Sequence, residues 1–94
     1  MSLLLKDPDA VLDYTVDWGA NYLAAGELIA ESDWSVTPDE AGGLSVTGSS
    51  FDPSTTTVKA AGGIAGHLYR LVNRISTAAG RTDDRSLIIR VENR

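Results

Sequence analysis

Hydrophobic and polar residues alternate strictly along residues 12–18 of the chain. The apolar members carry even numbers and the polar members odd numbers: Leu12, Tyr14, Val16 and Trp18 against Asp13, Thr15 and Asp17. A period of two places successive side chains on opposite faces of an extended strand. The segment is therefore predicted to be a strand with one buried face. The glycine-bounded residues 19–26 break the pattern and predict a loop or short turn, with Tyr22 and Leu23 capping one end of the core.

The next apolar run, residues 26–38, changes parity along its length. Trp34 and Val36 share a parity with Leu28, but Ile29 has the opposite one. A β-bulge, or a strand buried on both faces near its start, would reconcile the two halves. Pro38 should end the strand, because proline has no N–H to donate to a sheet.

Short strands and turns continue through the middle of the chain. Residues 39–43 read as a turn, residues 44–48 as a strand with Leu44 and Val46 inward, and residues 49–54 as another turn. Residues 55–61 are rich in β-branched residues and predict a further strand.

Two alternating runs end the chain, at about residues 68–78 and 85–92. In the first run one face carries Tyr69, Leu71, Asn73, Ile75 and Thr77, and in the second Leu87, Ile89 and Val91. Pairing these faces in an antiparallel hairpin requires an odd number of loop residues. Five residues fit, either 79–83 or 80–84, and Gly80 can supply a positive φ.

These elements predict an all-β fold: an Ig-like or fibronectin-like antiparallel β-sandwich of six to eight short strands, in one domain over residues 1–94. Tyr69 stands on the inward face near the start of the penultimate strand, as a tyrosine corner requires. Trp18, Trp34 and Tyr69 are expected to fill the core between the two layers, with Trp18 and Trp34 on the sheet opposite that of Tyr69.

Composition narrows the classes of function. The 94 residues include no cysteine, which fits a reducing compartment and excludes disulfides and thiolate metal sites. The start of the chain lacks signal-peptide features, and no apolar run reaches the length of a spanning helix, so a soluble protein without membrane contact is expected. The net charge of -5 argues against a nucleic-acid partner.

Charge is distributed unevenly along the chain. Residues 1–66 hold two lysines and ten acidic residues, a sum of -8, whereas residues 67–94 hold six arginines and three acidic residues, a sum of +3. The two parts could lie side by side in one domain and neutralise each other. Alternatively, the patches could orient neighbouring copies or a partner.

No pattern in the chain predicts an enzyme, a cofactor or a metal. His67 is the single histidine and lacks the companions of a zinc site, so it is interpreted as an ordinary residue near a strand start. The glycine-rich segment 60–66 lacks the features of a phosphate loop and is followed by a strand pattern. The carboxylate pairs, Asp13 with Asp17 and Asp83 with Asp84, are interpreted as solvated.

Two features predict protein–protein contacts. Three apolar residues, Leu68, Val72 and Ile88, project from the outer face of the last two strands among Arg70 and Arg90. Ahead of the first clear strand, residues 1–8 form either an edge strand or an arm that docks on a neighbouring subunit. The candidate interface comprises Leu3, Leu4, Leu5, Leu68, Arg70, Val72, Ile88 and Arg90.

Three segments of the sequence carry a family resemblance. They are "DPDAVLDYTVDW", "YLAAGELIAESDW" and "YRLVNRISTAAGRTDDRSLIIRV", and the match as a whole spans about residues 7–92. Their most specific parts are Asp13, Tyr14, Asp17 and Trp18, the strand from Gly26 to Trp34, and Tyr69, Asn73, Ile75, Thr77, Gly80 and Arg81. The chain resembles the fiber-tail adaptor proteins of tailed bacteriophages and prophages.

The resemblance implies an Ig-like sandwich that joins tail or fiber components, with other phage tail or fiber proteins as partners and no catalytic residues. It places the protein in the virion tail, and in the host cytoplasm during assembly. Whether the chain also forms a homo-oligomer stays open. An alternative from the fold class alone is a module that binds carbohydrate or a host surface, for which Tyr22 and Phe51 are the candidate loop aromatics.

Overall fold

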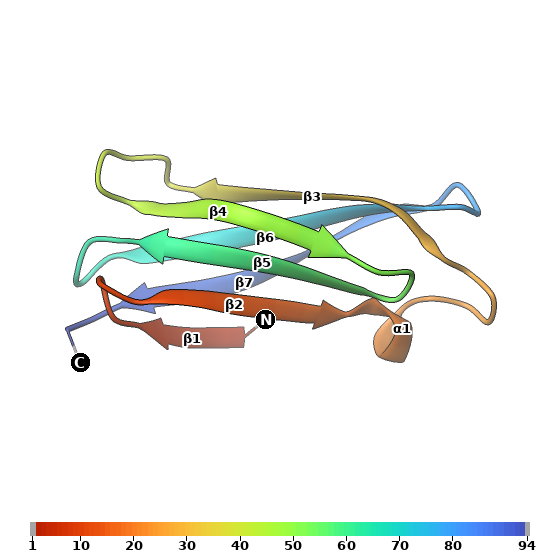
Figure 1. The fold of residues 1–94 in the computed structure, drawn as a ribbon, viewed down its shortest axis with the longest axis horizontal. Coiled ribbons are helices and arrows are strands. Elements are labelled where there is room, and N and C mark those ends of the chain that lie inside the picture. Colours follow the sequence, from red (N-terminus) through yellow and green to blue (C-terminus); the bar gives the residue numbers. More distant parts are fainter. Residues whose placement is uncertain (1, 94) are drawn as a thin grey trace.

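The computed structural model describes residues 2–93, apart from the side chains of Ser2 and Asn21, and contains seven strands and one helical turn in that range. In chain order the elements are β1 (Ser2–Lys6), β2 (Val11–Asp17), α1 (Trp18–Asn21), β3 (Ile29–Thr37), β4 (Leu44–Phe51), β5 (Thr55–Gly62), β6 (Leu68–Thr77) and β7 (Thr82–Val91). The strands run along the long axis of the molecule (Figure 1).

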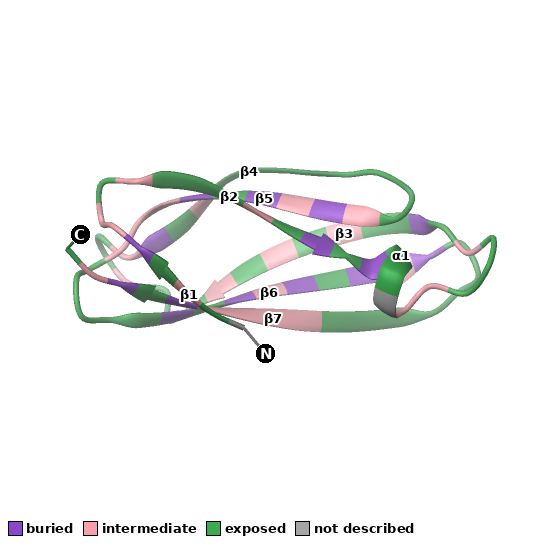
Figure 2. Ribbon diagram, turned by 90° about the horizontal axis from the view of Figure 1, so that it is seen from below, coloured by how far each residue is buried: buried purple, intermediate pink, exposed green. Residues whose placement is uncertain are grey.

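The strands form two layers, which confirms the predicted Ig-like β-sandwich. One sheet has the order β1-β7-β6-β3 and the other the order β2-β5-β4. Figure 2 shows the two layers from the side, with buried residues gathered along the strands. Neighbouring strands are antiparallel, except that β1 runs parallel to β7. Of the two alternatives for the N-terminal residues, the structure has residues 2–6 as an edge strand.

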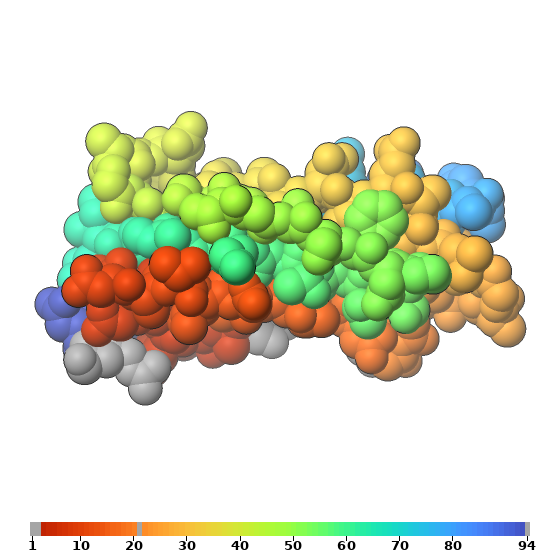
Figure 3. All heavy atoms as spheres, viewed as in Figure 1, coloured from red at the N-terminus to blue at the C-terminus, as the bar shows by residue number. Residues whose placement is uncertain are grey.

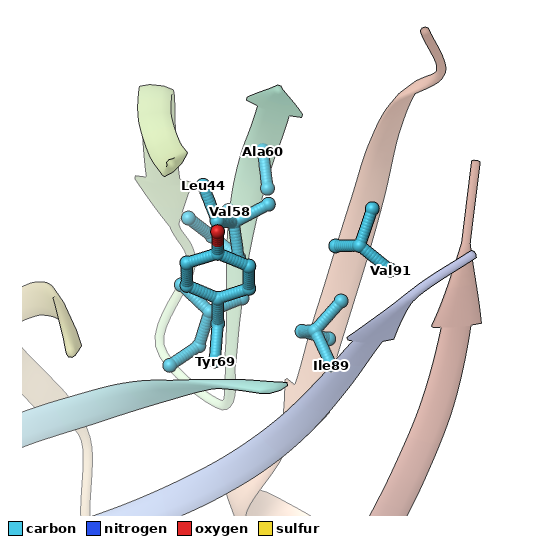
Figure 4. Packing of buried hydrophobic residues seen from close by; sticks show 7 residues of the cluster. Leu44, Val58, Ala60, Tyr69, Ile89 and Val91 are labelled. Carbon is cyan, nitrogen blue, oxygen red and sulfur yellow. The ribbon is translucent and has the colours of Figure 1, made fainter. Parts of the chain in front are cut away.

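The core consists of two groups of side chains joined in the middle. The first group is Leu44, Val58, Ala60, Tyr69, Leu71, Ile89 and Val91, and the second is Val16, Trp18, Ile29 and Ile75. Trp34 and Leu87 are partly buried and pack against both groups. Figure 4 shows the Tyr69 ring in the first group, facing side chains of β4 and β5 from the opposite sheet. Each fully buried aliphatic side chain stabilises the fold by roughly 1.5–3 kcal/mol.

The predicted face assignments are confirmed for β6 and for the end of β2, where Val16 is buried, whereas Leu12 at the start of β2 is 37% exposed. All five inward residues of β6, from Tyr69 to Thr77, are buried. The parity change in β3 is a bulge: the register shifts between Ile29 and Glu31, so that Ile29 is buried while Leu28 is 50% exposed. Tyr22 and Leu23 pack against Trp18 and its neighbours at one end of the core, as expected.

Three details differ from the sequence predictions. The hairpin between β6 and β7 has the predicted five residues beyond its last pair, but they are residues 77–81, because Ser76 pairs with Thr82. β4 continues to Phe51, so residues 49–51 form strand and not turn. Trp34 lies on β3 in the same sheet as Tyr69, and it is only partly buried.

Candidate interaction surface

One face of the molecule gathers most of the residues predicted to make contacts. In the four-stranded sheet, Leu5 pairs with Arg90 and Arg90 with Leu68, which forms one row across three strands. Since directly paired residues point to the same side of a sheet, the row shares one face. The next row contains Leu3, Ile88 and Arg70. The parallel pairing of β1 with β7 thus brings the N-terminal leucines beside the outer face of β6 and β7.

We call this surface the docking face and define it by Leu3, Leu5, Leu68, Arg70, Val72, Ile88 and Arg90. All three leucines of the docking face are well exposed, with exposed fractions of 63% for Leu3, 53% for Leu68 and 44% for Leu5. Val72 and Ile88 are half-buried. Contiguous exposed apolar side chains are characteristic of contact surfaces.

The two arginines of the docking face differ in their surroundings. Arg90 forms an ion pair with Glu92 at the end of β7. Arg70 is exposed and forms no ion pair with any residue within 2–93. Arg70 is therefore the cation of this face that is available for a carboxylate from outside the chain.

Leu4 does not belong to the docking face. It pairs with Ile89, whose side chain is buried, and it packs against the first core group. Its direction follows from the alternation of β1, in which Leu3 and Leu5 face outward.

Lys6 occupies an inward position that the sequence did not reveal. It pairs with Val91 and is fully buried. Its Nζ donates hydrogen bonds to the carbonyl oxygens of Gly62 (2.7 Å) and Asp7 (2.9 Å). Burial lowers the pKa of Lys6, and the negative charges of Asp7 and Asp9 partly oppose that shift. The ammonium group fastens the end of β1 to the end of β5.

A second polar cluster, at the turn into β6, forms the predicted tyrosine corner. The Tyr69 hydroxyl accepts a hydrogen bond from the backbone N–H of Ile64 (3.0 Å) and donates one to Glu40 (2.5 Å). His67 Nδ1 lies 2.9 Å from the same carboxylate oxygen. Hydrogen bonds from Tyr69 and His67 lower the pKa of Glu40, while burial and the bond to Glu40 raise the pKa of Tyr69. The cluster joins the β3–β4 connection to the start of β6.

At the opposite end of the sandwich, Arg81 holds the loop before β3 through an ion pair with Glu27. The Arg81 guanidinium makes two hydrogen bonds to the Glu27 carboxylate, whose side chain is only 4% exposed. Glu27 also accepts from the Thr77 hydroxyl (2.8 Å) and the backbone N–H of Ala24 (3.0 Å). The pKa of Glu27 is lowered to about 2, chiefly by the hydrogen bonds from Arg81. This ion pair neutralises part of the charge difference between the two parts of the chain.

A shallow groove of about 340 Å³ lies on the three-stranded sheet. It is lined by Asp13, Thr47, Gly48, Ser49, Ser50, Thr57 and Lys59. The two aromatic residues considered for carbohydrate binding do not line it. Tyr22 is half-buried, and its ring packs edge-on against that of Trp18, with 5.3 Å between the ring centroids. The Cζ atom of Arg81 lies over the Tyr22 ring, 4.4 Å from its centroid. Phe51 is 45% exposed at the end of β4.

Metal-binding clusters and membrane-spanning helices are both absent from residues 2–93. No three or more histidine, cysteine, aspartate or glutamate residues in this range are placed to hold a metal ion. No helix in this part of the chain has the length and apolar character that crossing a membrane requires.

Fold and surface together define an Ig-like β-sandwich whose most distinctive exposed feature is an apolar face with arginines. A solved structure supports this class: the solution structure of the PKD domain from KIAA 1837 protein matches with a TM-score of 0.54 and 16% sequence identity. The match covers 98% of this chain and 79% of that one. No curated protein matches the sequence. The family model described as podophage GP4 fiber-tail adaptor protein gp77 matches residues 6–90, and the chain belongs to this family.

Proposed function

We propose that the chain is a non-catalytic structural protein of a phage or prophage-derived virion, which links tail and fiber components through protein–protein contacts. Membership of the fiber-tail adaptor family supports this role. The proposal places the protein in the tail of the particle, and in the host cytoplasm while the particle assembles. Its partners are other phage tail or fiber proteins.

The docking face is the proposed contact surface. The observation that carries this choice is the convergence of seven predicted residues from β1, β6 and β7 on one side of one sheet. Its exposed leucines offer apolar area, and Arg70 offers a charge without an ionic partner within residues 2–93. The matching partner surface presents apolar side chains with a carboxylate placed against Arg70.

Charge reversal tests the contact in the assembled particle. Arg70→Glu with Arg90→Glu should place two carboxylates where the partner presents its own, and particles should lose fiber attachment when examined by electron microscopy. Lys59→Glu, an exposed charge on the opposite sheet, is the matched control and should leave attachment intact. Complete fiber attachment in the double variant, with unfolding temperature unchanged, would refute this face as the contact surface.

A further inference from the structure

The outer edge of β1 has backbone N–H and C=O groups that form no hydrogen bond to another strand within residues 2–93. Among the strands of residues 2–93, β1 pairs only with β7. On the side of β1 that faces β7, the carbonyl oxygen of Lys6 accepts a hydrogen bond from the N–H of Glu92 (2.9 Å). Because successive residues of a strand direct their N–H and C=O groups to alternate sides, Leu3 and Leu5 direct theirs away from β7. Four hydrogen-bonding groups thus face outward along the rim.

The other sheet edges carry the features that normally prevent strand addition, and β1 does not. β3 has a bulge and the charged residues Glu31 and Asp33, β4 has a bulge, and β2 carries Asp13 and Asp17. Such bulges and charges keep exposed edges from pairing with other chains. The single charge of β1 is on Lys6, which is buried and cannot protect the rim. β1 is therefore the edge best suited to receive another strand.

We propose that β1 pairs antiparallel with β1 of a second copy of this chain, related by a twofold axis that passes midway between the two Leu4 residues. In this register Leu3 lies opposite Leu5 of the second copy, and Leu4 opposite Leu4. Leu3 and Leu5 exchange N–H···O=C bonds in both directions, so all four outward groups of each copy are used. A register with Leu3 opposite Leu3 would pair only half of them.

The side chains of β1 favour the same pairing, and the rim adds no charge that opposes it. The register places the exposed leucines of the two copies opposite one another on one face of a continuous eight-stranded sheet. Two copies with a net charge of -5 repel each other, and the rim residues Leu3, Leu4 and Leu5 add no charge to that repulsion. β1 lies along the lower rim below β2, so the four-stranded sheet extends past the three-stranded one where the second copy would join (Figures 1 and 3).

Molar mass by light scattering, measured on the full chain over a wide range of concentration, tests the proposal. The 10.0 kDa chain should reach twice its mass as concentration rises. Leu5→Pro removes only an outward N–H, and proline is tolerated on edge strands, so this variant should stay monomeric. Leu3→Lys with Leu5→Lys should have the same effect, since edge lysines oppose strand addition. Leu68→Lys, an equally exposed leucine on an interior strand, is the control and should dimerise like the parent.

Two results would overturn the pairing: a parent chain that remains a monomer at every concentration, or a Leu5→Pro variant that folds and still dimerises. Amide hydrogen exchange of the parent provides a test that needs no variant. The amides of Leu3 and Leu5 should exchange more slowly as concentration rises, and concentration-independent exchange would also contradict the proposal. Arg70→Glu should leave the mass unchanged, because Arg70 lies on the interior strand β6 and not on the β1 edge, although Leu3 and Leu5 belong both to this edge and to the docking face.

Discussion

Asn73 on β6 accepts a hydrogen bond at 2.9 Å from the indole Nε1 of Trp18, and both side chains are fully buried. The same amide oxygen accepts from the Thr56 hydroxyl (2.6 Å), and the amide nitrogen donates to the Ser32 hydroxyl (3.0 Å) and the Asp33 carbonyl (3.1 Å). One polar side chain therefore connects both sheets and the helical turn α1 from inside the core. A buried network with every member satisfied fixes the relative placement of the elements it joins.

Asn73→Leu should destabilise the protein strongly, although leucine has a similar size and suits a core. The substitution leaves the Trp18 indole and the Thr56 hydroxyl buried without their acceptor, and each such loss costs about 1–3 kcal/mol. The free energy of unfolding, measured by urea denaturation, should fall by about 3 kcal/mol or more. Ser35→Ala, at an exposed position on the neighbouring strand β3, is the control, with an expected change within about 0.5 kcal/mol. Equal stability of the two variants would show that the amide network contributes little.

The Tyr69 hydroxyl gives a second prediction, in which two tyrosines are compared. Tyr69→Phe leaves the Ile64 N–H and the Glu40 carboxylate without their shared partner, and should cost about 1–2 kcal/mol. Tyr14→Phe is the matched control, because the Tyr14 hydroxyl is buried and has no hydrogen-bond partner within residues 2–93. Its removal should be neutral or stabilising. Tyr69→Ala, which also empties space in the core, should cost about 3 kcal/mol or more. Thermal unfolding of the three variants checks the order, and a Tyr14→Phe loss as large as that of Tyr69→Phe would contradict it.

The sequence predicted the parts of the fold that depend on which way side chains face. Period-two alternation assigned the buried face of β6 correctly, because a register error of one residue would expose Leu71 and Ile75. The tyrosine corner was predictable for a related reason: Tyr69 stands inward at the start of β6, where its hydroxyl reaches back to the preceding connection. The bulge in β3 was one of the two explanations that the parity conflict between Ile29 and Trp34 allowed, and the register shift in the structure selects it.

Strand ends were less predictable, because cross-strand pairs between polar residues determine them. Thr82 and Asp84 read as loop, yet in the structure they extend β7: the Thr82 hydroxyl meets Ser76 at 3.3 Å, and Asp84 pairs with Arg74 at 3.3 Å. Such contacts are compatible with exposed strand positions and have no periodic signal.

The inward direction of the Leu4 and Lys6 side chains also could not be predicted from the sequence. The run "SLLLK" has no alternation of polar and apolar residues, so only its pairing with β7 decides which side chains face the core. For the candidate surface, the sequence indicated the outer face of β6 and β7 and, separately, the N-terminal leucines. That these form one surface depends on the parallel β1–β7 pairing, which no local pattern encodes.

Low pH should weaken the ion pair between Glu27 and Arg81. The pKa of Glu27 is about 2 in the folded protein, below its ordinary value of 4.5, so the folded state binds this proton less tightly than the unfolded state. Its contribution to stability is complete above pH 4.5 and is lost as pH falls from 4.5 toward 2. Glu27→Gln should be less stable than the parent at pH 7, and the difference in urea midpoint should shrink across this interval. Glu31→Gln, at an exposed position on β3, is the control. A difference between parent and Glu27→Gln that does not vary with pH would contradict the assignment.

Two glycines with opposite backbone requirements give the last prediction. Gly80 has a φ of 88° in the β6–β7 hairpin, a conformation that L-residues adopt at a cost of roughly 1–2 kcal/mol. An added Cβ would meet no atom within 4 Å, so Gly80→Ala isolates the backbone cost. Gly48, within β4, also has open space where a Cβ would stand and has no positive φ. Gly48→Ala should therefore be neutral or stabilising by about 0.4–1 kcal/mol, through a less flexible unfolded chain. The unfolding temperature should fall for Gly80→Ala, whereas for Gly48→Ala it should rise or stay unchanged. Equal loss in both variants would mean that the sign of φ does not determine the outcome in the hairpin.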